Sequence, residues 1–250
     1  MKKQSIIFGF HAVAAVLASA PERIVKLYQQ SDMDNKRLQI LLEQAQQKQI
    51  RIEAVDKQQL NAWAQGERHQ GVLIEVLPQL LQDEEALFNQ LWQSEKPPFL
   101  LLLDEIQDPH NLGACLRSAN GAGVDAVIIT ADRSAGLTPV ARKVAAGAAE
   151  TTPVITVTNL ASTLRRLKKA GIWIFGLAGE AAEPIYQIDL TGPIGLVLGA
   201  EGKGLRRLTR SLCDQLVAIP MAGSVSSLNV SVATGIALFE IVRQRQRPKN

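Results

Sequence analysis

The chain has 250 residues, a formal net charge of +3, 4% aromatic residues and two cysteines. A chain of this length has room for two domains, and domains of that size need no disulfide or structural metal. With only two cysteines, the sequence excludes a disulfide scaffold and a zinc ribbon. The aromatic residues are too few for both a core and the base-stacking surface of a single-strand RNA-binding domain, while the mild positive charge favours anionic partners.

No segment has the pattern of a secretory signal or a membrane span. Lys2 and Lys3 open the chain, but the apolar run that follows is interrupted by Gly9 and His11 and leads to no cleavage site. The other apolar runs are too short to cross a bilayer. We therefore expect a cytoplasmic protein with no membrane partner.

Charge divides the sequence into three parts. Residues 1–77 hold ten Lys and Arg against eight Asp and Glu, residues 78–98 hold one against four, and residues 99–250 hold sixteen against twelve. The acidic middle part has prolines at its ends and one short amphipathic segment at 84–92. We predict an N-terminal domain at 1–77, a linker at 78–98 and a second domain at 99–250.

Short apolar strands alternate with helical patterns in the first domain. Strands are predicted at 24–28, 50–55 and 72–77, and helices at 35–48 and 57–65. The first of these helices has apolar residues at helical spacing and a solvent face rich in Gln and Lys. The pattern indicates a small α/β domain, and its sequence has no phosphate-binding loop or cluster of metal-ligating residues.

Longer apolar runs alternate with helices in the second domain. Strands that are apolar on both faces and separated by helices predict a parallel sheet covered on both sides. Such sheets bind ligands beyond the carboxyl ends of their strands. The predicted strands are 100–103, 126–129, 154–157, 173–178, 194–198 and 216–219, and the predicted helices are 113–122, 138–149, 160–170, 203–212 and 228–244. The loops of interest follow Leu103, Ala178, Leu198 and Ile219.

Three of these loops are unusually rich in polar residues or glycine. After the first strand come Asn111, expected to cap a helix, and Arg117 on that helix, so that both can face one site. The loop at 199–204 has three glycines, which permit a ligand to approach the backbone, and it contains Glu201. Its spacing fits neither a P-loop nor a dinucleotide-binding fingerprint. The third loop, 220–233, has more Ser and Asn residues than helix capping needs.

Together the three loops resemble the motifs of the SpoU branch of the SPOUT methyltransferases. The similar segments are Asn-x-Gly-x-x-x-Arg-x-Ala at 111–119, Leu-Gly-Ala-Glu-Gly-x-Gly at 198–204, Ile-Pro-Met at 219–221 and Ser-Leu-Asn-Val-Ser at 227–231. The N-terminal part is similar in pattern to the L30e-like RNA-binding domain of many members. The resemblance implies an α/β fold, a parallel sheet with a C-terminal trefoil knot, beside a smaller L30e-like α/β N-terminal domain.

The resemblance also implies a reaction and its partners. Members use S-adenosylmethionine to methylate a ribose 2′-hydroxyl of RNA, and they act as homodimers with composite sites and no metal. The segment 108–114 and the two-domain layout are most similar to members that modify a guanosine in bacterial 23S ribosomal RNA, the large-subunit RNA.

The resemblance assigns roles to particular residues. The backbones at Gly199, Ile219 and Leu228 are expected to contact the cofactor. Arg117 is expected to orient phosphate and stabilise the alkoxide. Hydrogen bonds from four further residues, Asn111, Glu201, Ser227 and Asn229, are expected to position Arg117 and the ribose.

Some alternatives remain at this point. The proton acceptor for the 2′-hydroxyl is open, because an arginine stays protonated in most settings and His110 is the one histidine in the three loops. A transfer-RNA ribose methyltransferase is the nearest competitor, although the N-terminal domain argues against it. If the protein only bound RNA without catalysis, Glu201 and the polar third loop would have no evident function. A doubly wound nucleotide-binding enzyme is disfavoured because the sequence matches neither the P-loop nor the dinucleotide-binding motif.

Overall fold

The computed structural model describes residues 5–77, 84–93 and 96–246. Its contacts divide the chain into two compact units: Met1–Leu80 with Leu137–Thr151, and Leu81–Gly136 with Thr152–Asn250. Parts of the predicted linker, 78–83 and 94–95, lie outside the described residues. No helix among the described residues is long and apolar enough to span a membrane.

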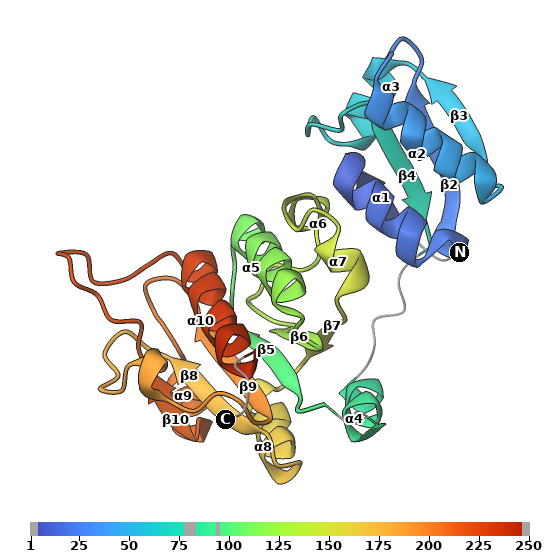
Figure 1. Ribbon diagram of the computed structural model, residues 1–250. Helices are drawn as coiled ribbons and strands as arrows, with labels where there is room; N and C mark the ends of the chain where they lie inside the picture. Colours follow the sequence, from blue (N-terminus) through green and yellow to red (C-terminus); the bar gives the residue numbers. More distant parts are fainter. Residues whose placement is uncertain (1–4, 78–83, 94–95, 247–250) are drawn as a thin grey trace. The chain divides into compact units, whose positions relative to one another are not determined.

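The first unit is built on a four-stranded sheet with the order β1-β4-β2-β3. Strands β1 and β2 run antiparallel to β4, and β3 runs parallel to β2. Figure 1 shows this sheet together with its helices. The strands are β1 (Ser5–Phe8), β2 (Ile24–Gln30), β3 (Ile52–Val55) and β4 (Val72–Val76), and the helices are α1 (Phe10–Ser19), α2 (Lys36–Gln47) and α3 (Lys57–Trp63), with a 3-10 turn at Pro21–Arg23.

Both faces of this small sheet are covered by helices. Val72 and Ile74 of β4 pack with apolar residues of α1 and α2, whereas Leu73 packs with Leu60 of α3. This alternation follows from the period of two in a strand. The predicted strands and helices are present with small shifts in their bounds, but β1 and α1 were not predicted. They share one apolar run, in which only Gly9, with φ of 91°, marks the turn between them.

The segment from 137 to 151 packs with the first unit although it lies far along the chain. The single helix predicted at 138–149 is wrong, because the structure has α6 (Pro139–Val144) and α7 (Ala148–Thr151). Gly147 separates them with φ of 96°, and a Cβ atom at this glycine would lie 2.6 Å from the Cβ of Ala15 in α1. Close approach to α1 therefore requires a residue without a side chain here.

A buried carboxylate at Glu150 holds this segment to the first unit. The Glu150 side chain is 1% exposed and forms ion pairs with Arg23 and Arg142. We expect Glu150→Gln to lower the free energy of unfolding by about 3–5 kcal/mol, because removing one partner of a buried pair leaves uncompensated charge. Glu67→Gln is the control, since Glu67 pairs with Lys143 at a half-exposed position and such pairs contribute about 0–1 kcal/mol. Urea unfolding of both variants measures the difference, and equal losses would contradict it.

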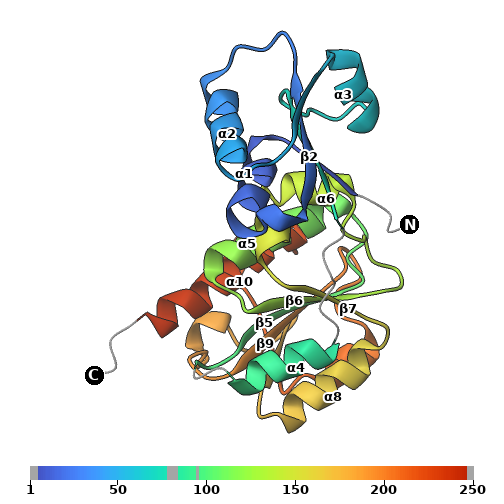
Figure 2. The same cartoon turned by 90° about the vertical axis from the view of Figure 1, so that its right-hand side faces the viewer.

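The second unit has a six-stranded sheet with the order β10-β8-β9-β5-β6-β7, and every pairing in it is parallel. This confirms the predicted parallel α/β domain. Figure 2 shows α4 and α8 on one face of the sheet and α5 and α10 on the other. The strands are β5 (Phe99–Asp104), β6 (Ala126–Thr130), β7 (Val154–Val157), β8 (Trp173–Leu177), β9 (Ile194–Gly199) and β10 (Gln215–Val217), and the helices are α4 (Glu84–Gln93), α5 (Pro109–Ala122), α8 (Leu160–Lys169), α9 (Arg207–Leu212) and α10 (Val230–Arg245), with a 3-10 turn at Ile185–Gln187.

Two features of this unit differ from the sequence prediction. Helix α9 begins at Arg207 rather than 203, because Gly202 and Gly204 have φ of 74° and 64° and so cannot continue a right-handed helix. The amphipathic segment of the predicted linker is α4, and its Leu87 and Phe88 belong to the core under the sheet. The linker helix is therefore part of the second unit's packing.

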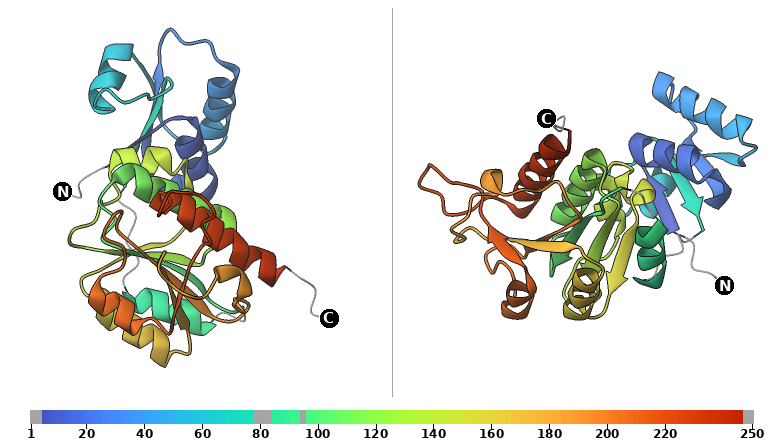
Figure 3. Two further views of the ribbon diagram at one scale, coloured as in Figure 1. Left: turned by 90° about the vertical axis from the view of Figure 1, so that its left-hand side faces the viewer. Right: turned by 60° about the horizontal axis from the view of Figure 1, so that its bottom comes forward.

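Helices α5 and α10 lie side by side, as both views in Figure 3 show. Small residues line their contact: a Cβ atom at Gly235 would lie 3.6 Å from the Ser118 hydroxyl oxygen, and one at Gly121 would lie 3.6 Å from the ring of Phe239. The Cys115 sulfur lies 3.3 Å from the Thr234 hydroxyl across the same contact. The two helices that carry the first and third motifs are thus fixed to one another.

Candidate functional site

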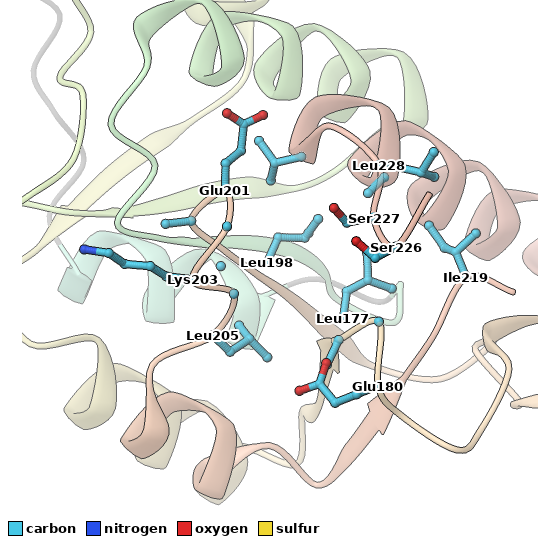
Figure 4. Close-up of a pocket in the computed structure, with 18 of the residues that line it drawn as sticks. Leu177, Glu180, Leu198, Glu201, Lys203, Leu205, Ile219, Ser226, Ser227 and Leu228 are labelled. Atoms are coloured by element: carbon cyan, nitrogen blue, oxygen red, sulfur yellow. The ribbon is translucent and has the colours of Figure 1, made fainter. Parts of the chain in front are cut away.

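A pocket of about 760 Å³ lies in the second unit, at the carboxyl ends of β8 and β9. Figure 4 shows Glu201 and Glu180 on opposite sides of it, with Leu198 and Leu177 between them. The pocket lies where open parallel sheets bind ligands. Its lining comes from three connections, Leu177–Glu180, Leu198–Leu205 and Ser226–Val230, together with Arg210, Ile219, Met221 and Ala233.

The glycine-rich loop folds back on itself. The Gly204 N–H donates to the Ala200 carbonyl at 2.8 Å. A Cβ atom at Gly199 would lie 2.1 Å from the carbonyl carbon of Gly204. Glycine at 199 is therefore required by the loop's own backbone, and Gly199 also lines the pocket.

Asn229 links all three loops. Its Nδ2 donates to Asn111 Oδ1 at 3.0 Å and to Glu201 Oε1 at 2.6 Å. Its Oδ1 accepts from the Ser231 N–H at 2.9 Å and so caps the start of α10. One side chain thus joins the α5 motif, the glycine-rich loop and the α10 motif.

Six of the eight predicted site residues line the pocket: Gly199, Glu201, Ile219, Ser227, Leu228 and Asn229. Asn111 does not line it, but it is buried and reaches the site through Asn229. The prediction that Asn111 caps α5 is wrong, because the Asp108 side chain accepts from the His110 N–H in that role.

Arg117 stands apart from the other predicted residues. Its side chain is exposed on α5, does not line the pocket, and makes no hydrogen bond or ion pair with any residue that the structure describes. His110 is also outside the pocket: its ring is 69% exposed and lies 3.2 Å from the Asp108 carboxylate. The pKa of Asp108 lies below its usual range. The main cause is the hydrogen bond from the His110 backbone N–H, and the contact with the His110 ring adds to it. The pocket of a single chain therefore contains neither candidate.

One charged pair at the pocket was not predicted. Glu180 and Arg210 both line the pocket and form an ion pair. The pKa of Glu180 is lowered by a hydrogen bond from its own backbone N–H and by Arg210. The sequence did indicate the loop after Ala178, but nothing in the chain order shows that Arg210 of α9 reaches it.

Both thiols are protonated at neutral pH. Burial raises the pKa of Cys115 and of Cys213 to about 11, compared with about 8.5 for an unfolded cysteine. A raised folded-state pKa favours the neutral thiol, so this contribution to stability is complete below the unfolded pKa and is lost as pH rises toward the folded one. We expect the free energy of unfolding to fall between about pH 8.5 and 11, and Cys115→Ala to make that fall shallower. Urea unfolding at a series of pH values measures it, and an unchanged slope in the variant would contradict the assignment.

The pocket combines apolar walls, exposed backbone and two carboxylates. A volume of this size suits a ligand of nucleoside dimensions. Among the described residues, no group of three His, Cys, Asp or Glu side chains is placed to hold a metal ion. The sheet and the pocket at its strand ends are typical of an α/β enzyme that binds a nucleoside-like molecule.

Comparison with known proteins identifies the family. A model described as "SpoU rRNA Methylase family" matches residues 98–239, and one described as "RNA 2'-O ribose methyltransferase substrate binding" matches residues 6–82. The chain belongs to the SpoU rRNA methylase family, as the three motifs predicted.

Two relatives are similar over almost the whole chain. The 23S rRNA (guanosine-2'-O-)-methyltransferase RlmB of Haemophilus ducreyi is 58% identical over 96% of this chain and 97% of its own length. The protein of the same name from Pseudomonas putida is 52% identical over 98% and 99%. Among solved structures, the SpoU methyltransferase AviRb from Streptomyces viridochromogenes, in complex with the cofactor AdoMet, has a similar fold, with a TM-score of 0.78, 23% identity, and coverage of 97% of this chain and 90% of AviRb.

Proposed function

We propose that this protein transfers a methyl group from S-adenosylmethionine to the ribose 2′-hydroxyl of a guanosine in 23S ribosomal RNA. The observation that carries the proposal is the 58% identity over nearly full length to a relative named for that reaction. The joining of all three motifs by Asn229 supports it, since residues from the three motifs form one hydrogen-bonded arrangement beside the pocket. We propose that it acts in the cytoplasm, with large-subunit ribosomal RNA as its partner, as the relatives named for this reaction support.

The pocket fits the cofactor in size and in the character of its walls. Leu198, Ile219 and Leu228 offer apolar surface, and the strand ends beside them offer backbone groups. We assign the backbones at Gly199, Ile219 and Leu228 to hold the adenosine part of the cofactor. When bound, S-adenosylmethionine supplies an electrophilic methyl group on a sulfonium. The side chains around it would exclude water and orient the RNA ribose.

A ribose hydroxyl is a weak nucleophile near neutral pH, so the site must stabilise negative charge that develops on its oxygen. Arg117 is the cation that we assign to this role, by orienting phosphate and stabilising the alkoxide. Asn229 holds Glu201 and Asn111 in one arrangement, which we assign to positioning the ribose together with Ser227. The motifs that enclose the site are those that the family threads as a trefoil knot, and we propose the same path here.

We further propose that the active form is a homodimer with composite sites. Within one chain Arg117 does not line the pocket, so a second copy would have to present it. Exposed apolar side chains on α10 support such an interface, since Val232 and Phe239 are each 50% exposed. Isolated exposed apolar residues are common, but two on one helix beside the motif that carries the site suit a contact between copies.

Light scattering after gel filtration tests the dimer. We expect the wild-type chain to have twice the monomer mass and Phe239→Glu to have the monomer mass, because a buried carboxylate without a partner is costly. Leu208→Glu on α9 is the control, since Leu208 is also exposed but lies on a different helix. A monomeric wild-type protein that is fully active would contradict the proposal.

We assign residues 1–77 to RNA recruitment, 78–98 to the linker and 99–250 to methyl transfer. The match of residues 6–82 to the substrate-binding model supports the first assignment. Because Leu137–Thr151 packs with the first unit, the full chain rather than a truncated one is the form to test.

Mapping ribose methylation in cells with and without the gene tests the reaction. We expect one guanosine in 23S ribosomal RNA to lose its 2′-O-methyl group when the gene is deleted. A plasmid copy of the wild-type gene should restore it. Loss of a methyl group from transfer RNA alone would support the competing assignment and overturn this one.

A further inference from the structure

A buried carboxylate that the reaction does not use lies directly behind the glycine-rich loop. Asp104 is the last residue of β5, its side chain is fully buried, and its strand partner is Gly199, where the loop begins. Burial of a charged group is costly unless a partner of opposite charge accompanies it. The partner of Asp104 therefore shows what the carboxylate stabilises.

That partner is Arg206, the residue that follows the loop. The Arg206 guanidinium Nη2 lies 2.6 Å from Asp104 Oδ1, and the Arg206 backbone N–H donates to Asp104 Oδ2 at 3.3 Å. Apart from this ion pair, Oδ1 has no well-directed hydrogen bond to any residue that the structure describes. Both ends of the loop are thus tied to one residue, through strand pairing at Gly199 and through charge at Arg206.

Other groups around Arg206 belong to the same arrangement. Glu105 lies 3.1 Å from Arg206 Nη1, and it also lies 3.6 Å from Arg133. The backbone at Glu105 has φ of 61°, a conformation that a residue with a side chain seldom adopts without support. Partial burial lowers the pKa of Arg206, but the hydrogen bond and charge of Asp104 outweigh it and the net shift is upward.

The loop between these two ties forms one wall of the pocket and carries Glu201. Glu201 Oε1 accepts from Asn229, so its position depends on where the loop lies. Gly202 and Gly204, with positive φ, have no side chains to hold the loop, and Leu205 is its apolar contact with the core. The ion pair of Asp104 with Arg206 adds a charged anchor at the end of the loop.

We infer that Asp104 and Arg206 are positioning residues for the pocket, and that their ion pair holds residues 199–205 in the conformation that binds S-adenosylmethionine and presents Glu201. The inference rests on the proposed function, because it assumes that the cofactor occupies this pocket. It assigns no contact with the cofactor to either residue. They act through the loop between them.

Two measurements on the full chain test the pair. The first is the S-adenosylmethionine Kd by calorimetry, at a temperature where each variant is folded by circular dichroism. We expect Asp104→Asn, which keeps the size of the side chain but removes its charge, to raise the Kd by about tenfold or more, since a broken buried pair is strongly unfavourable. Arg206→Met should do the same, and the double variant should be no worse than either single one, because the two residues act as a unit.

The second measurement needs no cofactor. Trypsin cleaves after Lys203, which lies inside the loop, and the cleavage rate reports how often the loop opens. We expect Asp104→Asn to raise this rate by about tenfold or more relative to wild type, for the same reason. Mass spectrometry of the fragments assigns the cleaved bond.

Asp214→Asn is the matched control. Asp214 pairs with Lys168 at 2.8 Å and accepts from the Ile174 N–H at 2.9 Å, so it is a structural carboxylate of the same unit outside the pocket. We expect it to lower thermal stability while the Kd and the cleavage rate after Lys203 stay at wild-type values. Wild-type behaviour of Asp104→Asn in both measurements would overturn the inference, and so would equal changes in Asp214→Asn. If wild-type protein does not bind S-adenosylmethionine, the proposed function fails, while the cleavage rates still test the anchor.

Discussion

Replacing Arg117 by alanine is expected to lower the rate of methyl transfer by about 10²- to 10³-fold, which is typical when one preorganised charged donor is removed from an active site. The loss should be in kcat, because the role assigned to Arg117 is strongest when negative charge develops on the ribose oxygen. The Kd for S-adenosylmethionine should stay unchanged, since the role assigned to Arg117 is toward the RNA phosphate and the ribose oxygen and not toward the cofactor. Single-turnover methylation of ribosomal RNA with tritiated cofactor measures the rate.

Two further variants separate the candidate roles. Arg117→Lys keeps the positive charge but loses the planar guanidinium, so we expect it to remain impaired. His110→Ala should retain most of the activity, because the His110 ring is exposed and its polar contact is with Asp108, outside the pocket. A nearly normal Arg117→Lys enzyme together with a crippled His110→Ala enzyme would instead make the histidine the base.

The second large effect concerns Asn229. Asn229→Ala removes the donor to Glu201 and Asn111 and also the cap of α10, so we expect a rate loss of about 10²-fold or more and a loss of about 1 kcal/mol in the free energy of unfolding. Asn229→Asp keeps the capping oxygen but replaces the Nδ2 donor with a second carboxylate beside Glu201. It should be at least as inactive as Asn229→Ala, with the cap retained. Rates and urea unfolding of the two variants distinguish the catalytic loss from the structural one.

Glu201→Ala completes this test. If Glu201 and Asn229 act as one unit, the double variant should be about as slow as the slower single variant, rather than showing the product of two losses. Independent, multiplying effects would show that the hydrogen bond between them does not serve the reaction. A fully active Asn229→Asp enzyme would contradict the assigned role directly.

The regular parts of the fold were predictable because each leaves a local pattern. The six strands of the parallel sheet are continuous apolar runs, and helix α8 has its asparagine cap and an apolar stripe in sequence. The points where helices end or begin were harder to predict. The end of α6 depends on Gly147 meeting Ala15, a contact between residues far apart in the chain, and the late start of α9 depends on how the glycine-rich loop closes.

The candidate site shows the same division. The motifs identified six residues that line the pocket, because their types and order resemble a known family. The hydrogen bonds that join Asn111, Asn229 and Glu201 are a property of three dimensions, as is the pairing of Asp104 with Arg206. Asn111 shows why position alone misleads: it lies where a helix cap is plausible, yet Asp108 takes that role and frees Asn111 for the site.

The order of strands in the second unit also constrains how the protein is made. The central strand β5 pairs with β9, so that Leu100 lies beside Gly195, 95 residues later in the chain. At translation rates of about 5–20 residues per second, β5 would wait roughly 5–19 seconds for this neighbour to be synthesised. During that time β5 has only β6 beside it, and the backbone groups along its other edge have no strand partner. Sheets rich in such distant pairings fold slowly. Nascent chains of this protein should therefore depend on chaperones that shield exposed strand edges.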